Sequence, residues 1–194
     1  MVTDRIRRHR YLVTLAGHWM REEHAVMIEQ AVPLAVVYRG WDGFQRQLLK
    51  AIAPLSPEQL ALPVAPHHWS LGQAIQHIIT DRAWWFHLWM GEGGEEMVPL
   101  ANWDGDGQPV RAPAELVAGL EATWKVIEGT LARWTVADLG HVFAPPASLT
   151  EAERETFGPN TRQEIIWHVH RHDVHHGGEL AMGMGGYHLP TIWG

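Results

Sequence analysis

Histidines with metal-binding spacing are concentrated near the C-terminal end of the chain. The 194-residue sequence contains 14 histidines, and five of them fall between positions 168 and 176. His168, His172 and His176 follow one another at four-residue steps, so on a helix they share one face, with neighbouring pairs about 6 Å apart along the axis. Two imidazoles one turn apart can both bind a single ion at about 2.1 Å. The spacing therefore predicts a divalent transition-metal site.

One ion binds only one of the two neighbouring pairs, because His168 and His176 are about 12 Å apart along the helix axis. A further ligand must come from a second helix, and His77, in an isoleucine-rich segment, is the best candidate. Two alternatives compete with a metal site: His77 as a neutral core histidine, and the cluster as a solvated surface face. Helix phase separates His170 and His175 from the stripe, and we expect these two side chains to be solvated.

Apolar residues at three- and four-residue steps predict the four helices that would position these histidines. The first runs from Pro33 to a stop at Pro54, and the third from Pro113 to about Arg133. The second and fourth begin at capping-box sequences and end at glycines. The two boxes are Ser70-Leu71-Gly72-Gln73 and Thr161-Arg162-Gln163-Glu164, and the expected ends are at about Met90 and Met182. No run alternates apolar and polar residues for long enough to demand a strand, so the predicted fold class is an all-α four-helix bundle.

The connection between the second and third helices decides which histidine pair meets His77. Residues 91–112 are rich in Gly, Asp, Asn and Pro and are long for a connection within one domain, which indicates a crossover. If it is a crossover, the fourth helix runs antiparallel to the second, and His172 and His176 lie at the depth of His77. Simple up-and-down winding would favour His168 and His172 instead.

The first 32 residues differ from the rest of the chain. They hold five arginines and four acids, with only a short apolar run. We expect residues 1–32 to be an N-terminal extension, weakly ordered or a peripheral helix, and residues 33–194 to form the bundle domain.

Composition narrows the class of function. The chain has no cysteine, so any metal must be held by nitrogen or oxygen ligands, and no cysteine nucleophile exists. Residues 33–194 carry ten basic and eighteen acidic groups, a net charge of −8 that argues against a nucleic-acid partner. No apolar stretch approaches the roughly 20 residues needed to cross a bilayer. We expect a soluble, cytoplasmic protein with a small-molecule substrate and no membrane partner.

Two further groups of residues could take part in chemistry. Asp81 lies one turn after His77 and could orient an imidazole or act as a catalytic base; the alternative is a solvent-facing or capping carboxylate. Four tryptophans could wall an apolar substrate pocket near the ion, or could fill the core. These are Trp84, Trp85, Trp89 and Trp167.

Two segments resemble motifs of the DinB/YfiT-like superfamily of four-helix bundles. Residues 69–78 (WSLGQAIQHI) resemble its second-helix start, and residues 168–180 (HVHRHDVHHGGEL) resemble its fourth-helix motif, with weaker agreement over residues 41–60. The resemblance implies an up-down-down-up bundle, a metal triad of His77, His172 and His176, and frequent homodimers. The sequence departs from the family at two positions: Gly177 replaces the usual Arg, and Glu179 the usual Gln.

The resemblance also supplies reaction classes. Members include thiol S-transferases that use low-molecular-weight bacterial thiols, maleylpyruvate isomerases and a metal-dependent hydrolase. We therefore expect a metal-dependent enzyme that transfers a small thiol to an electrophile, with zinc or nickel bound, or alternatively iron. There are two alternatives: a hydrolase that uses metal-bound water, and a non-catalytic metal-binding module of the stress response.

Overall fold

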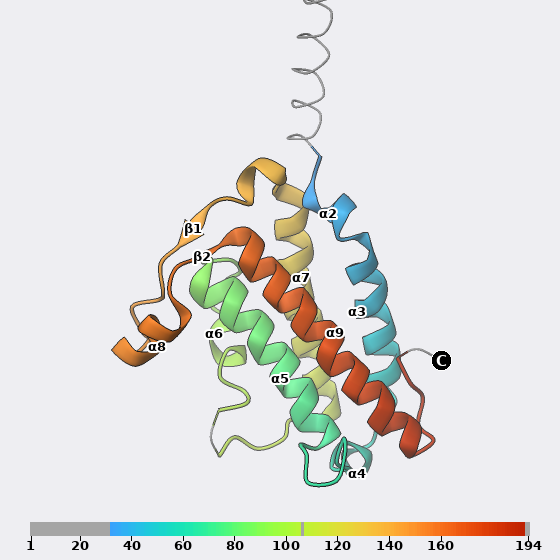
Figure 1. Cartoon of the computed structure of the whole chain (residues 1–194). Coiled ribbons are helices and arrows are strands. Elements are labelled where there is room, and N and C mark those ends of the chain that lie inside the picture. The colour runs from blue at the N-terminus through green and yellow to red at the C-terminus, as the bar shows by residue number, and fades with distance from the viewer. Residues whose placement is uncertain (1–31, 106, 193–194) are drawn as a thin grey trace, which may run out of the picture.

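Four long helices form the framework of the molecule. The structure is a computed structural model that describes residues 32–105 and 107–192, so the predicted N-terminal extension lies outside the described residues except for residue 32. The long helices are α3 (Arg39–Ile52), α5 (Leu71–Ala83), α7 (Pro113–Arg133) and α9 (Arg162–Gly186) (Figure 1). The all-α bundle predicted from the periodicity is confirmed.

The sequence signals for the helix starts are seen as hydrogen bonds. The Ser70 hydroxyl accepts the backbone N–H of Gln73 at 3.2 Å, and the Gln73 side chain accepts the N–H of Ser70 at 2.9 Å. Thr161 and Glu164 make the equivalent pair at 3.2 and 2.7 Å. Each box satisfies two backbone donors that a helix start leaves free, so α5 and α9 begin where the sequence predicts.

Several elements differ from the expectation. The first helix is broken at Tyr38 into α2 (Leu34–Val37) and α3, and α5 passes into a π-helical segment, Trp84–Trp89. The connection between α7 and α9 contains secondary structure of its own. It holds a 3₁₀ turn (Val136–Asp138), α8 (Glu151–Phe157), and the antiparallel strands β1 (Val142–Phe143) and β2 (Asn160–Thr161). Two-residue strands are too short to show an alternating pattern.

The central helices α5 and α7 run in the same direction. A Cβ on Gly119 of α7 would lie 3.1 Å from Ile79 of α5, and the rings of Phe86 and Trp134, further along both segments, stack with centroids 6.2 Å apart. Residues 91–112, with the short α6 (Met97–Leu100), are therefore the expected crossover. The short α4 (Pro57–Leu60) lies in the connection that precedes α5.

Helix α9 runs antiparallel to α5, and α3 antiparallel to α7. The Tyr187 hydroxyl, just after α9, donates to the Pro63 carbonyl before α5, while His168, early in α9, bonds to Asp81, late in α5. Gln45 of α3 donates to the backbone of α7. The winding is up-down-down-up, as the resemblance implied, and Figure 1 shows α5 and α9 side by side.

Two glycines explain how closely α9 packs. A Cβ on Gly177 would lie 2.5 Å from the Phe44 ring, and one on Gly183 would lie 2.8 Å from the Val64 carbonyl. The helix continues through Gly183 to Gly186 and does not end near Met182 as predicted. Here glycine provides close approach between elements in place of a helix stop.

A fully buried polar network fixes α9 against its neighbours. The Arg82 guanidinium donates to both carboxylate oxygens of Asp173 at 2.7–3.0 Å and to Gln45 at 2.8 Å, and the Trp41 indole donates to Asp173 at 2.6 Å. Each of these side chains is at most 1% exposed. The network sets the rotation of α9 and with it the direction of the neighbouring His172.

Over residues 32–105 and 107–192, no helix combines the length and the apolar character that a membrane span requires.

Candidate metal centre

Three histidines from two helices converge at the α5–α9 contact. His77 comes from α5, and His172 and His176 from successive turns of α9. The Nε2 atoms of His77 and His172 are 2.9 Å apart, and one nitrogen from each of the three rings lies within 4.8 Å of the others. The structure thus brings together the pair that the crossover argument favoured, and the geometry excludes the solvated surface face for these side chains.

A carboxylate lies beside the Nδ1 atom of each ring. Asp104 is 2.6 Å from Nδ1 of His77, and Glu179 is 2.7 Å from Nδ1 of His176. Asp81 is 3.4 Å from Nδ1 of His172. A carboxylate on Nδ1 fixes the imidazole tautomer and orientation and raises the basicity of Nε2, as in many metal sites. Nε2 is then the nitrogen of each ring left for a ligand.

Asp81 lies behind the histidines. Its Oδ1 is 3.2 Å from Nε2 of His168, while its Oδ2 and Nδ1 of His172 are both buried without a hydrogen bond. Burial raises the pKa of the Asp81 carboxyl. The carboxylate is buried and lies against two imidazoles, so the alternative of a solvent-facing carboxylate is excluded, and an orienting role remains a prediction.

The fold favours the neutral form of His172 and His176. Burial, together with the neighbouring imidazoles, lowers the pKa of His172 to about 2, and burial also lowers the pKa of His176 although Glu179 opposes it. A neutral imidazole retains the lone pair that a metal ion requires.

The donor set fits a divalent transition metal. Two nitrogens that each lie 2.1 Å from one ion are about 3.0–3.4 Å apart for angles between 90° and the tetrahedral value. The observed 2.9 Å between His77 and His172 is close to the lower limit. Neutral imidazoles without thiolates suit zinc, nickel, copper and iron.

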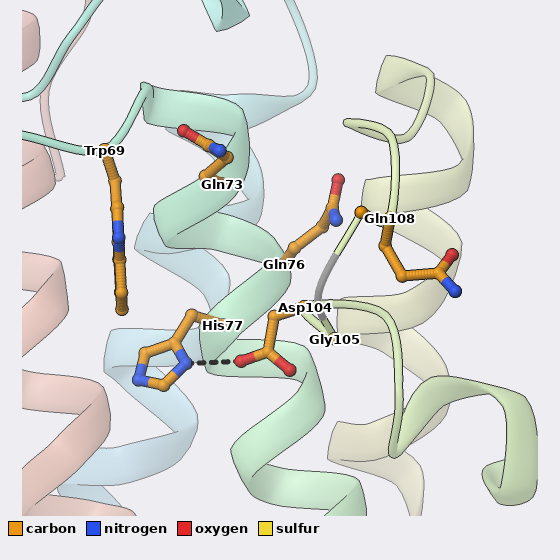
Figure 2. Close-up of a pocket in the computed structure, with 8 residues that line it drawn as sticks. Trp69, Gln73, Gln76, His77, Asp104, Gly105 and Gln108 are labelled. Carbon is orange, nitrogen blue, oxygen red and sulfur yellow. Dashed lines mark hydrogen bonds and ion pairs between the residues drawn. The ribbon is translucent and has the colours of Figure 1, made fainter.

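Two pockets of different character reach this cluster and share His77 and Asp104. One, of about 300 Å³, is lined by polar side chains and the exposed Trp69, as Figure 2 shows for Gln73, Gln76 and Gln108. The other, of about 490 Å³, has an aromatic wall. Its lining comprises His77, Thr80, Asp81, Trp84, Trp85, Ala101, Asn102, Asp104, Phe157, His168 and His172.

The tryptophans and the other two histidines of the sequence analysis lie in different parts of the structure. Trp84 and Trp85 line the larger pocket, Trp89 is buried behind them, and Trp167 is exposed on the outside of α9. His175 is exposed as expected. His170 is half-buried against the Trp41 ring at 5.0 Å, so the expectation that it is solvated was wrong.

From the sequence, Asp104 was not identified as a site residue, and Glu179 was noted only as a departure from the family motif. Asp104 lies in the crossover, and its acidic side chain in a polar loop was the only sequence signal for a functional residue there. Its backbone N–H donates to the Thr80 hydroxyl at 3.3 Å. Glu179, a departure from the family motif, contacts His176 and also lies 3.3 Å from His175. His175, His176 and Glu179 thereby form a second group of donors that shares His176.

A bundle with two parallel central helices and three converging histidines that could bind a metal ion defines a class of small helical protein. The model of the DinB superfamily matches residues 41–180, and the chain belongs to this superfamily. A crystal structure of a DinB-like protein from Bacillus cereus is similar, with 22% identity and a TM-score of 0.58, covering 78% of this chain and 91% of that chain. At this identity the likeness shows the fold. No curated protein matched the chain.

Proposed function

We propose that this protein is a metal-dependent enzyme that transfers a low-molecular-weight thiol to an electrophilic small molecule. The observation that carries the proposal is the convergence of three imidazoles, one of which, His77, lines two pockets. Three protein ligands leave coordination positions open for a reactant, whereas a purely structural site uses four. In the described part of the chain the group contains three donors, since His168 is engaged by Asp81.

The metal site is proposed to consist of His77, His172 and His176, with zinc or nickel bound and iron as an alternative. A divalent ion held there lowers the pKa of a coordinated thiol or water, and so supplies a nucleophile at neutral pH. Asp104 and Glu179 hold the Nδ1 protons of two of the rings. Asp81 acts as a positioning residue for His172 and for His168 at the pocket wall.

In the proposed reaction the thiol sulfur forms a bond to an electrophilic carbon. The bond from that carbon to its leaving group breaks, the leaving group departs with the electron pair, and the thiol proton passes to water. The aromatic wall of the larger pocket offers the electrophile an apolar surface. The chain contains no cysteine that could compete with the external thiol.

Metal analysis of histidine variants tests the site. His77→Ala, His172→Ala and His176→Ala should each lose nearly all bound metal, because two imidazoles bind a divalent ion far more weakly than three. His170→Ala and His175→Ala, from the same helix, should retain about one ion per chain. Full occupancy in His77→Ala or His176→Ala would contradict the assignment.

A thiol panel tests the reaction. Zinc- or nickel-loaded protein should consume 1-chloro-2,4-dinitrobenzene only when a thiol such as 2-mercaptoethanol or cysteine is added, with one chloride released per thioether formed. Turnover of esters or amides without thiol would favour the hydrolase. Absence of both activities, with a fourth protein ligand in the metal-loaded structure, would favour the non-catalytic module.

A further inference from the structure

The larger pocket has two chemically different ends. At one end lie the rings of Trp84, Trp85 and Phe157, with centroids 4.8–6.0 Å apart. Elsewhere the lining consists of polar groups, among them His77, His172 and the carboxylates of Asp81 and Asp104. A ligand that fills the volume of about 490 Å³ would therefore place an apolar body against the rings and reach toward the histidines with its other end.

The charge of the lining restricts the ligand further. Among the described residues that line the pocket none is an arginine or a lysine, while two are aspartates. Away from the ion proposed at the histidines, a substrate body that carries carboxylates would face this acidic lining without an arginine or lysine to pair with, at a cost in binding.

Phe157 is the ring best placed to determine specificity. It ends α8, which extends from the bundle on the arm 142–161 (Figure 1), and it is 43% exposed. Its neighbours Trp84 and Trp85 lie in the π-helical segment that directly continues α5, which carries His77, so a ligand between these rings is positioned relative to the histidines. Phe157 contributes a wall to the pocket from outside the bundle core.

The pocket on the other side of His77 differs in chemistry. Its side chains are mainly amides, from Gln73, Gln76 and Gln108, together with the Asp104 carboxylate (Figure 2). Gln76 is buried and uses both polar atoms of its amide on the crossover backbone, and the Oε1 atoms of Gln73 and Gln108 accept from Ser70 and Arg111. The Nε2 groups of Gln73 and Gln108 can donate to hydroxyl and carbonyl oxygens of a ligand, and the Asp104 carboxylate can accept from its hydroxyl and N–H groups. The two reactants of a transfer reaction can therefore approach the same histidine from opposite sides.

From this arrangement we infer that the larger pocket binds an uncharged aromatic electrophile against Trp84, Trp85 and Phe157, and that the amide-lined pocket receives the polar body of the thiol. This inference rests on the proposed function for its second half. The first half concerns binding alone and can be tested without turnover.

Equilibrium binding separates the ligand classes. Calorimetric titration uses the full chain as purified, before and after chelation of bound metal, with two probes of similar shape. We expect uncharged 1,3-dinitrobenzene to bind at least tenfold more tightly to the chelated protein than 3,5-dinitrobenzoate, since only the latter carries a carboxylate. Equal affinities would overturn the inference.

Variants locate the binding. Phe157→Ala should weaken 1,3-dinitrobenzene about five- to tenfold, the size expected for one lost aromatic contact. Trp167→Ala, which removes an exposed aromatic ring outside the pocket, should leave the affinity unchanged. Asn102→Arg adds a cation to the lining and should tighten 3,5-dinitrobenzoate at least fivefold. An affinity unaffected by Phe157→Ala, or a benzoate affinity unaffected by Asn102→Arg, would contradict the placement.

Kinetics distinguish failure of the inference from failure of the proposed function. With 1-chloro-2,4-dinitrobenzene and 2-mercaptoethanol, Phe157→Ala should raise the KM of the electrophile and not that of the thiol, and Gln108→Ala should do the reverse. If no thiol supports turnover while the binding results hold, the proposed reaction is wrong and the aromatic site stands. If turnover occurs but Phe157→Ala changes neither binding nor the electrophile KM, the site assignment is wrong.

Discussion

Two polar clusters lie between α5 and α9, and their hydrogen bonding is opposite in character. In the cluster around Arg82 and Asp173, the guanidinium donates from all three nitrogens and both carboxylate oxygens accept, with no side-chain exposure. In the histidine cluster, Nδ1 of His172 and Oδ2 of Asp81 have no hydrogen bond, and the ring nitrogens face one another. The first cluster is complete without a ligand. In the second, Nδ1 of His172 and Oδ2 of Asp81 lie 3.4 Å apart behind the rings, and the atoms that a ligand could reach are the facing Nε2 atoms of His77 and His172.

The two clusters are also coupled by the sequence. Asp81 precedes Arg82 on α5, and His172 precedes Asp173 on α9, so each adjacent pair directs one side chain to the core and one to the pocket. Fixing Asp173 therefore fixes the rotation of α9 that points His172 at His77. We therefore expect the free energy of unfolding to depend on the cluster around Arg82 and Asp173, and metal binding to depend on the histidine cluster.

The largest expected effect is on stability. Asp173→Ala leaves the Arg82 cation buried and unpaired, and should lower the free energy of unfolding by about 3–5 kcal/mol. His172→Ala should change it by no more than about 1 kcal/mol in the metal-free protein. Urea denaturation after chelation measures both. The double variant Arg82→Met, Asp173→Leu should recover much of the loss, and an equal cost for His172→Ala would make both clusters structural.

A smaller effect is expected on metal affinity. Asp104→Asn removes the charge beside Nδ1 of His77 and should weaken zinc binding about 10–100-fold, as measured by chelator competition. Asp138→Asn is a matched control, because Asp138 also accepts hydrogen bonds, from Thr135, but lies outside the cluster. Equal zinc affinity in both variants would show that Asp104 serves only to hold the crossover.

The pH dependence of metal-free stability should reflect the depressed pKa of His172. The unfolded chain binds a proton at this residue near pH 6.5, whereas the folded chain does so only near pH 2. Stability should therefore fall as the pH drops below about 6.5, by roughly 1.4 kcal/mol per pH unit for each such histidine. His176, whose pKa is also lowered, should likewise reduce stability as the pH falls, whereas Asp81, whose pKa is raised, should increase it.

The contribution of His172 is isolated by a variant. His172→Gln keeps a polar side chain that does not titrate, so the difference in unfolding free energy from the unaltered chain should shrink or change sign between pH 7 and pH 5. Parallel curves for the two proteins would mean that His172 is not held neutral by the fold.

Features that repeat along the chain were predictable, and features that depend on contacts across it were not. Capping boxes at Ser70 and Thr161 and the four-residue histidine spacing are local, and both are seen in the structure. Gly177 departs from the family motif, and the reason that only glycine fits there, the Phe44 ring at 2.5 Å from a Cβ, lies on another helix. The positions of Asp104 and Arg82 depend on the crossover and on core packing, which no local pattern encodes.

The smallest effect is expected at the position where the chain departs from its family. In Glu179→Gln the amide oxygen can still accept the Nδ1 proton of His176, so the ring keeps its orientation and only the charge is lost. Zinc affinity should fall less than about tenfold, whereas Glu179→Ala, which removes the acceptor, should reach the 10–100-fold loss expected at Asp104. If the two Glu179 variants lose affinity equally, the carboxylate acts through its charge, and the metal centre here is electrostatically distinct from one with glutamine. If neither variant changes the affinity, Glu179 belongs with the surface residues around His175 and not with the histidine cluster.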